Sequence, residues 1–187
     1  MLRSAMEITL TRLDDRGIHR SELVEFLTGH EFPFHSTRRP ARADIERSID
    51  DGRFGDADHA SFWIDTNAGR IGLVVLIDLT DDAPLLDLRL ATEHRGKGYG
   101  ADVLKALTTH VFTTMPAVTR LEGQTREDNI AMRRTFVRAG FVKEAHYRDG
   151  WPVENGPPLA SVGYGILRRD WQGGRTTPVV WDDLQPG

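Results

Sequence analysis

The pattern of apolar and polar positions divides the chain into segments of strand length and segments of helix length. Alternating or continuous apolar runs predict strands over residues 6–13, 60–65, 70–79, 85–91, 119–125, 141–148 and 161–169. Apolar positions at helical spacing predict helices over residues 21–28, 40–51, 99–112 and 128–139. This order of elements predicts an α/β fold in which one mixed sheet carries helices on both faces.

The helix at residues 99–112 has a well-defined apolar face, on which Leu104, Leu107 and Val111 fall together. The helix at residues 128–139 ends at Gly140, where a left-handed C-terminal cap is expected. We expect a single domain over residues 1–172. The tail, residues 173–187, is expected to be irregular or to dock on a surface, and its apolar segment around Trp181 is compatible with a homodimer.

Composition narrows the class of protein. The chain has 187 residues, 39% hydrophobic and 28% charged, which is ordinary for a globular protein. A net charge of −4 argues against a nucleic-acid partner, and no run is long and apolar enough for a membrane span or a signal peptide. The absence of cysteine excludes a disulfide scaffold, a thiolate nucleophile and a cysteine metal site. We therefore expect a cytoplasmic protein without a metal.

A glycine-rich turn, residues 94–101 (HRGKGYGA), lies between a predicted strand and a predicted helix. Bare backbone N–H groups at a helix N-terminus form an anion site, although a tight turn without a ligand explains the glycines equally well. The Walker motif fails because Gly98 follows Lys97 where Ser or Thr is required. The dinucleotide motif is a weak match, since the spacing here is G-x-G-x-G.

The loop from Arg95 to Gly100 resembles the R-x-x-G-x-G/A acyl-CoA loop of the GNAT N-acetyltransferases. A second match begins at Asn129, with an aromatic residue seven positions later and Gly140-Phe141 at positions eleven and twelve, as in the closing helix of that family. The resemblance covers roughly residues 6–170 and is nearest to the branch that acetylates ribosomal-protein N-termini. It implies the GNAT fold, with acetyl-CoA as the acyl donor.

The resemblance also implies which residues would hold acetyl-CoA. The pantetheine arm would lie along a strand end, the diphosphate would meet the loop amides, and the thioester would lie beside the closing helix. In that order the residues are Leu88, Leu90, Ala91 and Thr92, then Arg95, Gly96, Lys97, Gly98, Tyr99 and Gly100, then Asn129, Met132 and Phe136. Core packing is an alternative explanation of Phe136.

The implied reaction is acetyl transfer to an amine. Without a cysteine, direct attack by the amine in a ternary complex is the expected route. The two positions where relatives carry a general acid, tyrosine or serine, are Phe136 and Met132 here, and neither can donate a proton. An amine must lose a proton before it attacks, so a base is needed. Our first candidate is Glu122, for which a surface or ion-paired role is the alternative; further candidates are Glu154, Asp87 and Tyr147.

The acceptor is less clearly defined than the donor. Phe32, Phe34 and His35 lie between the first two helices, where this family shapes its acceptor groove, and Trp151 lies in the connection expected opposite. They suggest an aromatic-walled slot for a small amine or a peptide N-terminus, although closing the core would explain the same residues.

Three functions remain open on the sequence alone. The first is an acetyl-CoA-dependent N-acetyltransferase acting on a primary amine. The second is a GNAT-like domain that senses CoA without turnover, which the missing acid residues would favour. The third, a nicotinamide-dependent oxidoreductase, has only the weak dinucleotide match in its support.

Overall fold

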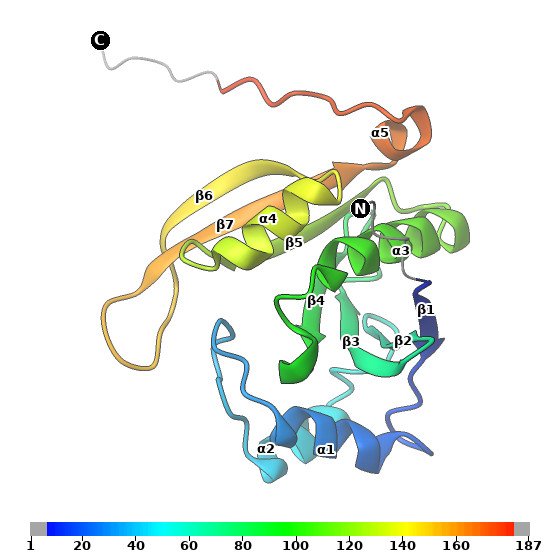
Figure 1. Cartoon of the computed structure of the whole chain (residues 1–187), viewed down its shortest axis with the longest axis vertical. Coiled ribbons are helices and arrows are strands. Elements are labelled where there is room, and N and C mark those ends of the chain that lie inside the picture. Colours follow the sequence, from blue (N-terminus) through cyan, green and yellow to red (C-terminus); the bar gives the residue numbers. More distant parts are fainter. Residues whose placement is uncertain (1–6, 182–187) are drawn as a thin grey trace.

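A computed structural model describes residues 7–181 of the chain, and its centre is one seven-stranded mixed sheet (Figure 1). The strands lie in the order β1-β2-β3-β4-β5-β7-β6. Their bounds are β1 Thr9–Arg12, β2 Ala60–Thr66, β3 Gly69–Ile77, β4 Leu85–Leu90, β5 Arg120–Arg126, β6 Val142–Trp151 and β7 Leu159–Leu167. All pairs are antiparallel except β4 with β5.

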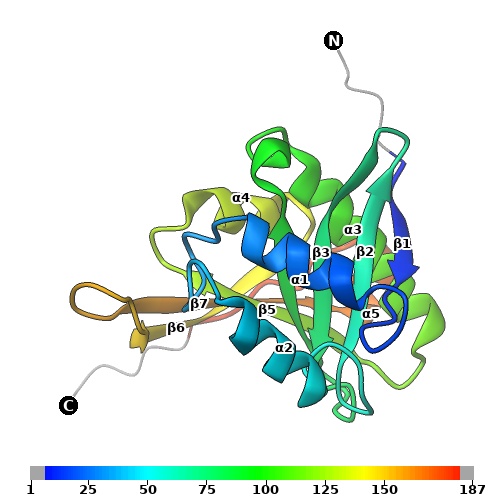
Figure 2. The ribbon, with the colours of Figure 1, turned by 90° about the horizontal axis from the view of Figure 1, so that it is seen from below.

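Helices cover both faces of this sheet, as predicted (Figure 2). On one face lie α1 and α2, and on the other lie α3 and α4. The helical bounds are α1 Arg20–Gly29, α2 Arg42–Asp50, the short 3₁₀ turn η1 Thr92–His94, α3 Tyr99–Thr114, α4 Ile130–Arg138 and α5 Arg168–Gly173. Among the described residues, no helix combines the length and apolar character needed to cross a bilayer.

Two hydrophobic cores result, one on each face of the sheet. Successive strand residues point to opposite faces, so Phe62 and Ile64 of β2 join the core beneath α3, whereas Trp63 joins the core beneath α1 and α2. Each of these three side chains is almost completely buried. Burying a large apolar side chain contributes about 1.5–3 kcal/mol, so both faces stabilise the sheet.

The parallel pair β4–β5 is short. Its register contains only Leu85 with Glu122 and Leu86 with Gly123, whereas β4 stays paired with β3 as far as Leu90. Residues 87–90 of β4 therefore have no strand partner on the β5 side. The sheet opens at this point.

Several predicted boundaries were wrong by a few residues, among them both ends of β1 and the end of β3. Arg168 and Arg169, expected at the end of the last strand, begin α5. The Arg168 guanidinium donates to the carbonyls of Phe112, Met115 and Val118 at 2.5, 2.6 and 2.6 Å, which ties the end of β7 to the C-terminal end of α3.

Trp151, expected in a loop, is instead the last residue of β6 and pairs with Leu159. Beyond α5, residues 174–181 form neither helix nor strand, and the Trp181 ring lies 5.9 Å from Lys143 Nζ. The last residues of the predicted tail, 182–187, lie outside the described residues, as does the beginning of the first predicted strand, residue 6.

Candidate active site

The loop between β4 and α3 leaves a helix N-terminus without a side-chain cap. Gly96 and Gly98 both have left-handed backbone angles, with φ of 70° and 85°. Gly98 is the N-cap residue of α3 and has no side chain with which to cap the first turn. A Cβ atom built on Gly96 would meet no atom within 4 Å, so open space adjoins the loop. Uncapped N–H groups beside open space suit a phosphate.

Arg95 anchors this loop through its side chain. Its Nε donates to the carbonyl oxygen of Leu90 at 2.8 Å, and its guanidinium lies 5.3 Å from the centroid of the Phe32 ring. Burial lowers the pKa of Arg95 from its usual value, an effect that Glu31 and Glu93 oppose. Because the guanidinium is turned inward to the strand end, the main chain of this residue is the part available to a ligand.

Gly100 has a packing role. A Cβ atom there would lie 2.9 Å from Thr135 Cγ2, so the missing side chain lets α3 and α4 approach closely. This contact fixes α4 beside the opening between β4 and β5.

The predicted thioester residues are all tied into α4. Asn129 is the N-cap residue; its Oδ1 accepts from the Met132 N–H at 3.2 Å, and its Nδ2 donates to Thr125 Oγ1 at 3.0 Å. Phe136 is completely buried and stacks on Tyr164 with 4.8 Å between ring centroids. In this structure Phe136 is part of the core rather than of an open groove wall.

These features fit acetyl-CoA. The bare start of α3 offers N–H groups for the diphosphate. The edge of β4 beyond its last pair with β5, which includes Leu88 and Leu90, offers backbone groups for the amides of the pantetheine arm, apart from the Leu90 carbonyl that Arg95 binds. Ala91 and Thr92 continue this edge into η1, so the predicted donor residues lie in one continuous stretch around the opening.

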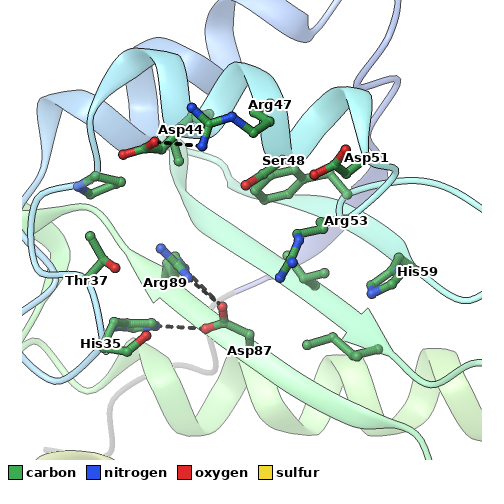
Figure 3. A pocket seen from close by; sticks show the side chains of 16 residues that line it. His35, Thr37, Asp44, Arg47, Ser48, Asp51, Arg53, His59, Asp87 and Arg89 are labelled. Carbon is green, nitrogen blue, oxygen red and sulfur yellow. Dashed lines mark hydrogen bonds and ion pairs between the residues drawn. The ribbon is translucent and has the colours of Figure 1, made fainter. Parts of the chain in front are cut away.

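On the opposite face of β4, the side chains of His35, Asp87 and Arg89 form a chain of contacts (Figure 3). His35 Nε2 lies 2.8 Å from Asp87 Oδ1, and Asp87 Oδ2 accepts from Arg89 Nη2 at 2.8 Å and from Nε at 3.0 Å. Burial alone would raise the pKa of Asp87, but Arg89 and His35 outweigh it and lower that pKa well below its usual value. Asp87 is therefore ionised at neutral pH.

This cluster lies where the sheet opens. Asp87 is the first residue of β4 after the last pair with β5, Leu86 with Gly123. His35 reaches it from the connection between α1 and α2, which also approaches β5: the Arg126 guanidinium lies 5.0 Å from the Phe34 ring centroid. The structure thus brings His35 and Phe34 to the mouth of the opening, whereas Phe32 is buried in the core beneath α1.

The candidate bases from the sequence lie on different parts of this face. Glu122 stands beside Leu85 and forms an ion pair with Arg120 Nε at 2.6 Å. Glu154, in the β6–β7 connection, accepts from the Arg38 backbone N–H at 3.4 Å, so that connection reaches the α1–α2 segment (Figure 1).

Tyr147 and Trp151 complete the sequence candidates. Tyr147 lies in β6 opposite Ser161, and its side chain is exposed. Trp151 is partly buried, and its Nε1 atom has no hydrogen-bond partner among the described residues.

A cavity of about 540 Å³ extends from this cluster beneath α2 and over β3 and β4 (Figure 3). Its charged and imidazole lining is His35, Asp44, Arg47, Asp51, Arg53, His59, Asp87 and Arg89. Of this set, only His35 and Asp87 are candidates on the sequence alone. The alternation of Asp87 and Arg89 along one strand was the available indication that both face the same side.

The comparison with protein families identifies the class. Residues 8–142 match the family described as "Acetyltransferase (GNAT) domain". The chain therefore belongs to the GNAT acetyltransferase family, and acetyl-CoA is its acyl donor. A search of curated proteins gave no match.

Solved structures support the same fold. A chimera of spermidine N-acetyltransferase SpeG from Vibrio cholerae and hSSAT superposes with a TM-score of 0.75 at 18% identity, over 88% of this chain and 98% of that one. SpeG from Vibrio cholerae in complex with CoA and spermine gives 0.68 at 20% identity, over 88% and 98%. A third SpeG structure, with manganese ions, gives 0.72 at 19% identity, over 90% and 96%. At these identities the likeness establishes the GNAT fold.

Proposed function

We propose that this protein transfers the acetyl group of acetyl-CoA directly to a primary amine in a ternary complex. The observation that carries the proposal is the opening of the sheet after the Leu86–Gly123 pair. The uncapped start of α3 lies at the end of β4, and the His35–Asp87 pair lies on the sheet's other face. Donor and acceptor sites on opposite sides of one opening allow a single-step transfer.

Two parts of the chain would each bind a different part of the donor, acetyl-CoA. The N–H groups of residues 96–100 would hold the diphosphate, and the free edge of β4 would hold the pantetheine arm. When bound, acetyl-CoA supplies the acetyl thioester that the amine attacks. The buried α4 side chains keep the wall of this opening rigid and dry, which strengthens hydrogen bonds made there.

His35 is our proposed base. The ionised Asp87 accepts the N–H of His35 Nε2, which leaves Nδ1 as the ring nitrogen with a lone pair. That nitrogen can take a proton from the incoming ammonium group. Asp87 itself is a poor base, because Arg89 and His35 stabilise its charged form.

The residues predicted from the sequence stay candidates for supporting roles. Glu122 is ion-paired with Arg120, which weakens its attraction for an ammonium group, whereas Glu154 accepts only from the Arg38 backbone N–H and keeps its charge for that role. Tyr147 offers an exposed hydroxyl on the same sheet face. Phe136 and Met132 supply no acid, which the reaction tolerates because a thiol with a pKa of about 8.5 is a fair leaving group.

Two acceptor types fit a primary amine. The names of the structural relatives point to spermidine and spermine, whereas the sequence resemblance to the ribosomal-protein branch points to a peptide N-terminus. Both deliver an ammonium group that must lose a proton before attack, so both make the same demand on His35.

The test compares His35→Gln with Glu122→Gln by CoA-thiol release across pH. With His35→Gln we expect kcat/KM to fall about 10²-fold near pH 7, the contribution of one general base. The loss should shrink toward pH 9.5, where more of the amine is already neutral. Glu122→Gln should lose less than the His35 variant and keep the parent's pH profile.

The opposite pattern would transfer the role of base to Glu122. Tight CoA binding without thiol release on any amine of a broad panel would contradict the proposed reaction and support the sensor function instead.

A further inference from the structure

The cavity beneath α2 has a charge balance that bears on the acceptor. Three aspartates and three arginines line it. Four of these six residues form two ion pairs. Arg47 Nη1 lies 3.2 Å from Asp44 Oδ1, and Arg89 binds Asp87. The two lining histidines are also engaged, His35 by Asp87 and His59 by Asp56. Asp51 and Arg53 are the charged lining residues that have no ion pair within the described part of the chain.

Arg53 is an exposed cation that lines the cavity. Within residues 7–181, its side chain takes part in no hydrogen bond or ion pair. Figure 3 shows it extending from the end of α2 toward Asp87 and Arg89. Asp51 is exposed at the C-terminal cap of α2. An unpaired guanidinium that faces a cavity is a ready partner for a carboxylate.

The charges also disfavour two other kinds of acceptor. A dicationic amine would meet the guanidinium groups of Arg47, Arg53 and Arg89, while the carboxylates of Asp44 and Asp87 are already neutralised. A dianionic phosphate would find one unpaired cation and would be repelled by Asp51. A ligand group with a single negative charge, such as a carboxylate, therefore matches the one unpaired cation of the cavity lining among the described residues, Arg53.

We propose that the acceptor is an amine that also carries a carboxylate, whose amino group lies at His35 and whose carboxylate binds Arg53. This inference rests on the proposed function, since it assigns the substrate class of the same site. It makes Arg53 a specificity-determining residue for the acceptor.

Three six-carbon amines that differ only at the far end test this substrate class: 6-aminohexanoate, hexylamine and 1,6-diaminohexane. Binding to the CoA-saturated protein is measured by calorimetry, and turnover by thiol release. We expect 6-aminohexanoate to bind at least tenfold more tightly than the other two, the effect of about one charge-assisted hydrogen bond.

Variants of single charged residues test whether Arg53 causes the preference for 6-aminohexanoate. Arg53→Gln should weaken 6-aminohexanoate about tenfold and change hexylamine less than twofold. Arg42→Gln removes the same charge at the first residue of α2, outside the cavity lining, and should change neither. Asp51→Asn, which removes a negative charge from the same lining, should keep the preference for the carboxylate or strengthen it.

Equal binding of the three amines, or a preference for 1,6-diaminohexane that Asp51→Asn removes, would overturn the assignment of the acceptor while leaving the transfer reaction intact. An equal effect of Arg42→Gln and Arg53→Gln would overturn the role of Arg53. Selective binding of 6-aminohexanoate without thiol release would uphold the substrate class and contradict the proposed reaction.

Discussion

Asp87 is the residue on which the acceptor side depends most. It joins β4 to the α1–α2 connection through His35, 52 residues away in the chain, and it also binds Arg89. Its side chain is 25% exposed, so solvent weakens these contacts only in part. The same carboxylate thus contributes to folding and sets which nitrogen of His35 is free.

Asp87→Asn should lower the free energy of unfolding by about 2 kcal/mol near pH 7, because two cationic or donor partners lose their charge-assisted bonds. The pKa of Asp87 is lower in the folded than in the unfolded chain. Its stabilisation is therefore fully present above the unfolded value of about 3.9 and is lost as pH falls toward the folded one.

The gap in stability between parent and Asp87→Asn should accordingly narrow below about pH 4. Urea unfolding of both proteins at a series of pH values measures this gap. A gap that stays constant from pH 7 to pH 3 would show that the carboxylate charge contributes nothing.

At the scale of elements, the junction of β5 and α4 holds the opening in place. Gly123 is the last residue of β5 paired with β4, and a Cβ atom there would lie 2.5 Å from Phe136 Cζ. The Phe136 ring is held in turn by Tyr164 and Phe141, at 4.8 and 5.3 Å between centroids. The ring has no space into which it could move without displacing its neighbours.

We expect Gly123→Ala to destabilise the protein by about 2 kcal/mol, the usual cost of overpacking a dense core. Gly29→Ala, at the end of α1 with no atom within 4 Å of the new Cβ, is the matched control and should be neutral or slightly stabilising. Thermal unfolding compares the two. Equal melting temperatures would mean that α4 shifts freely, and the rigid wall proposed here would be wrong.

The elements themselves could largely be predicted from the sequence, because each has an apolar pattern on at least one face. The glycine loop before α3 was predicted as well, since its residues depend on local backbone conformation. The element ends were less predictable: Arg168 leaves the strand because of three carbonyls in another part of the chain. Contacts between residues so far apart in the chain cannot be predicted from the local pattern of apolar and polar residues.

The acceptor side illustrates the same limit. Asp87 and Arg89 have the ordinary alternation of a strand, and nothing local indicates that His35 will reach them. The cavity exists only once α2 lies over β3 and β4, so Arg53 could not be singled out from the sequence. Its importance depends on which other charges are already paired.

In the whole molecule, each face of the sheet has its own hydrophobic core. The core beneath α3 and α4 supports the proposed donor side, and the core beneath α1 and α2 supports the proposed acceptor cavity. The pairing of β4 with β5 ends between these two sides, after Leu86 and Gly123. The single-domain boundary at residue 172 and the homodimer stay predictions.

The most direct test of this account is a calorimetric titration of the protein with CoA, together with Gly98→Trp. A tryptophan at the N-cap of α3 would crowd the uncapped N–H groups, at a backbone cost of about 1–2 kcal/mol for its left-handed angle. Gly174→Trp carries a similar backbone cost at the left-handed cap of α5, away from the loop. We predict saturable CoA binding by the parent and by Gly174→Trp, and none by folded Gly98→Trp; equal affinity in all three proteins would contradict the account.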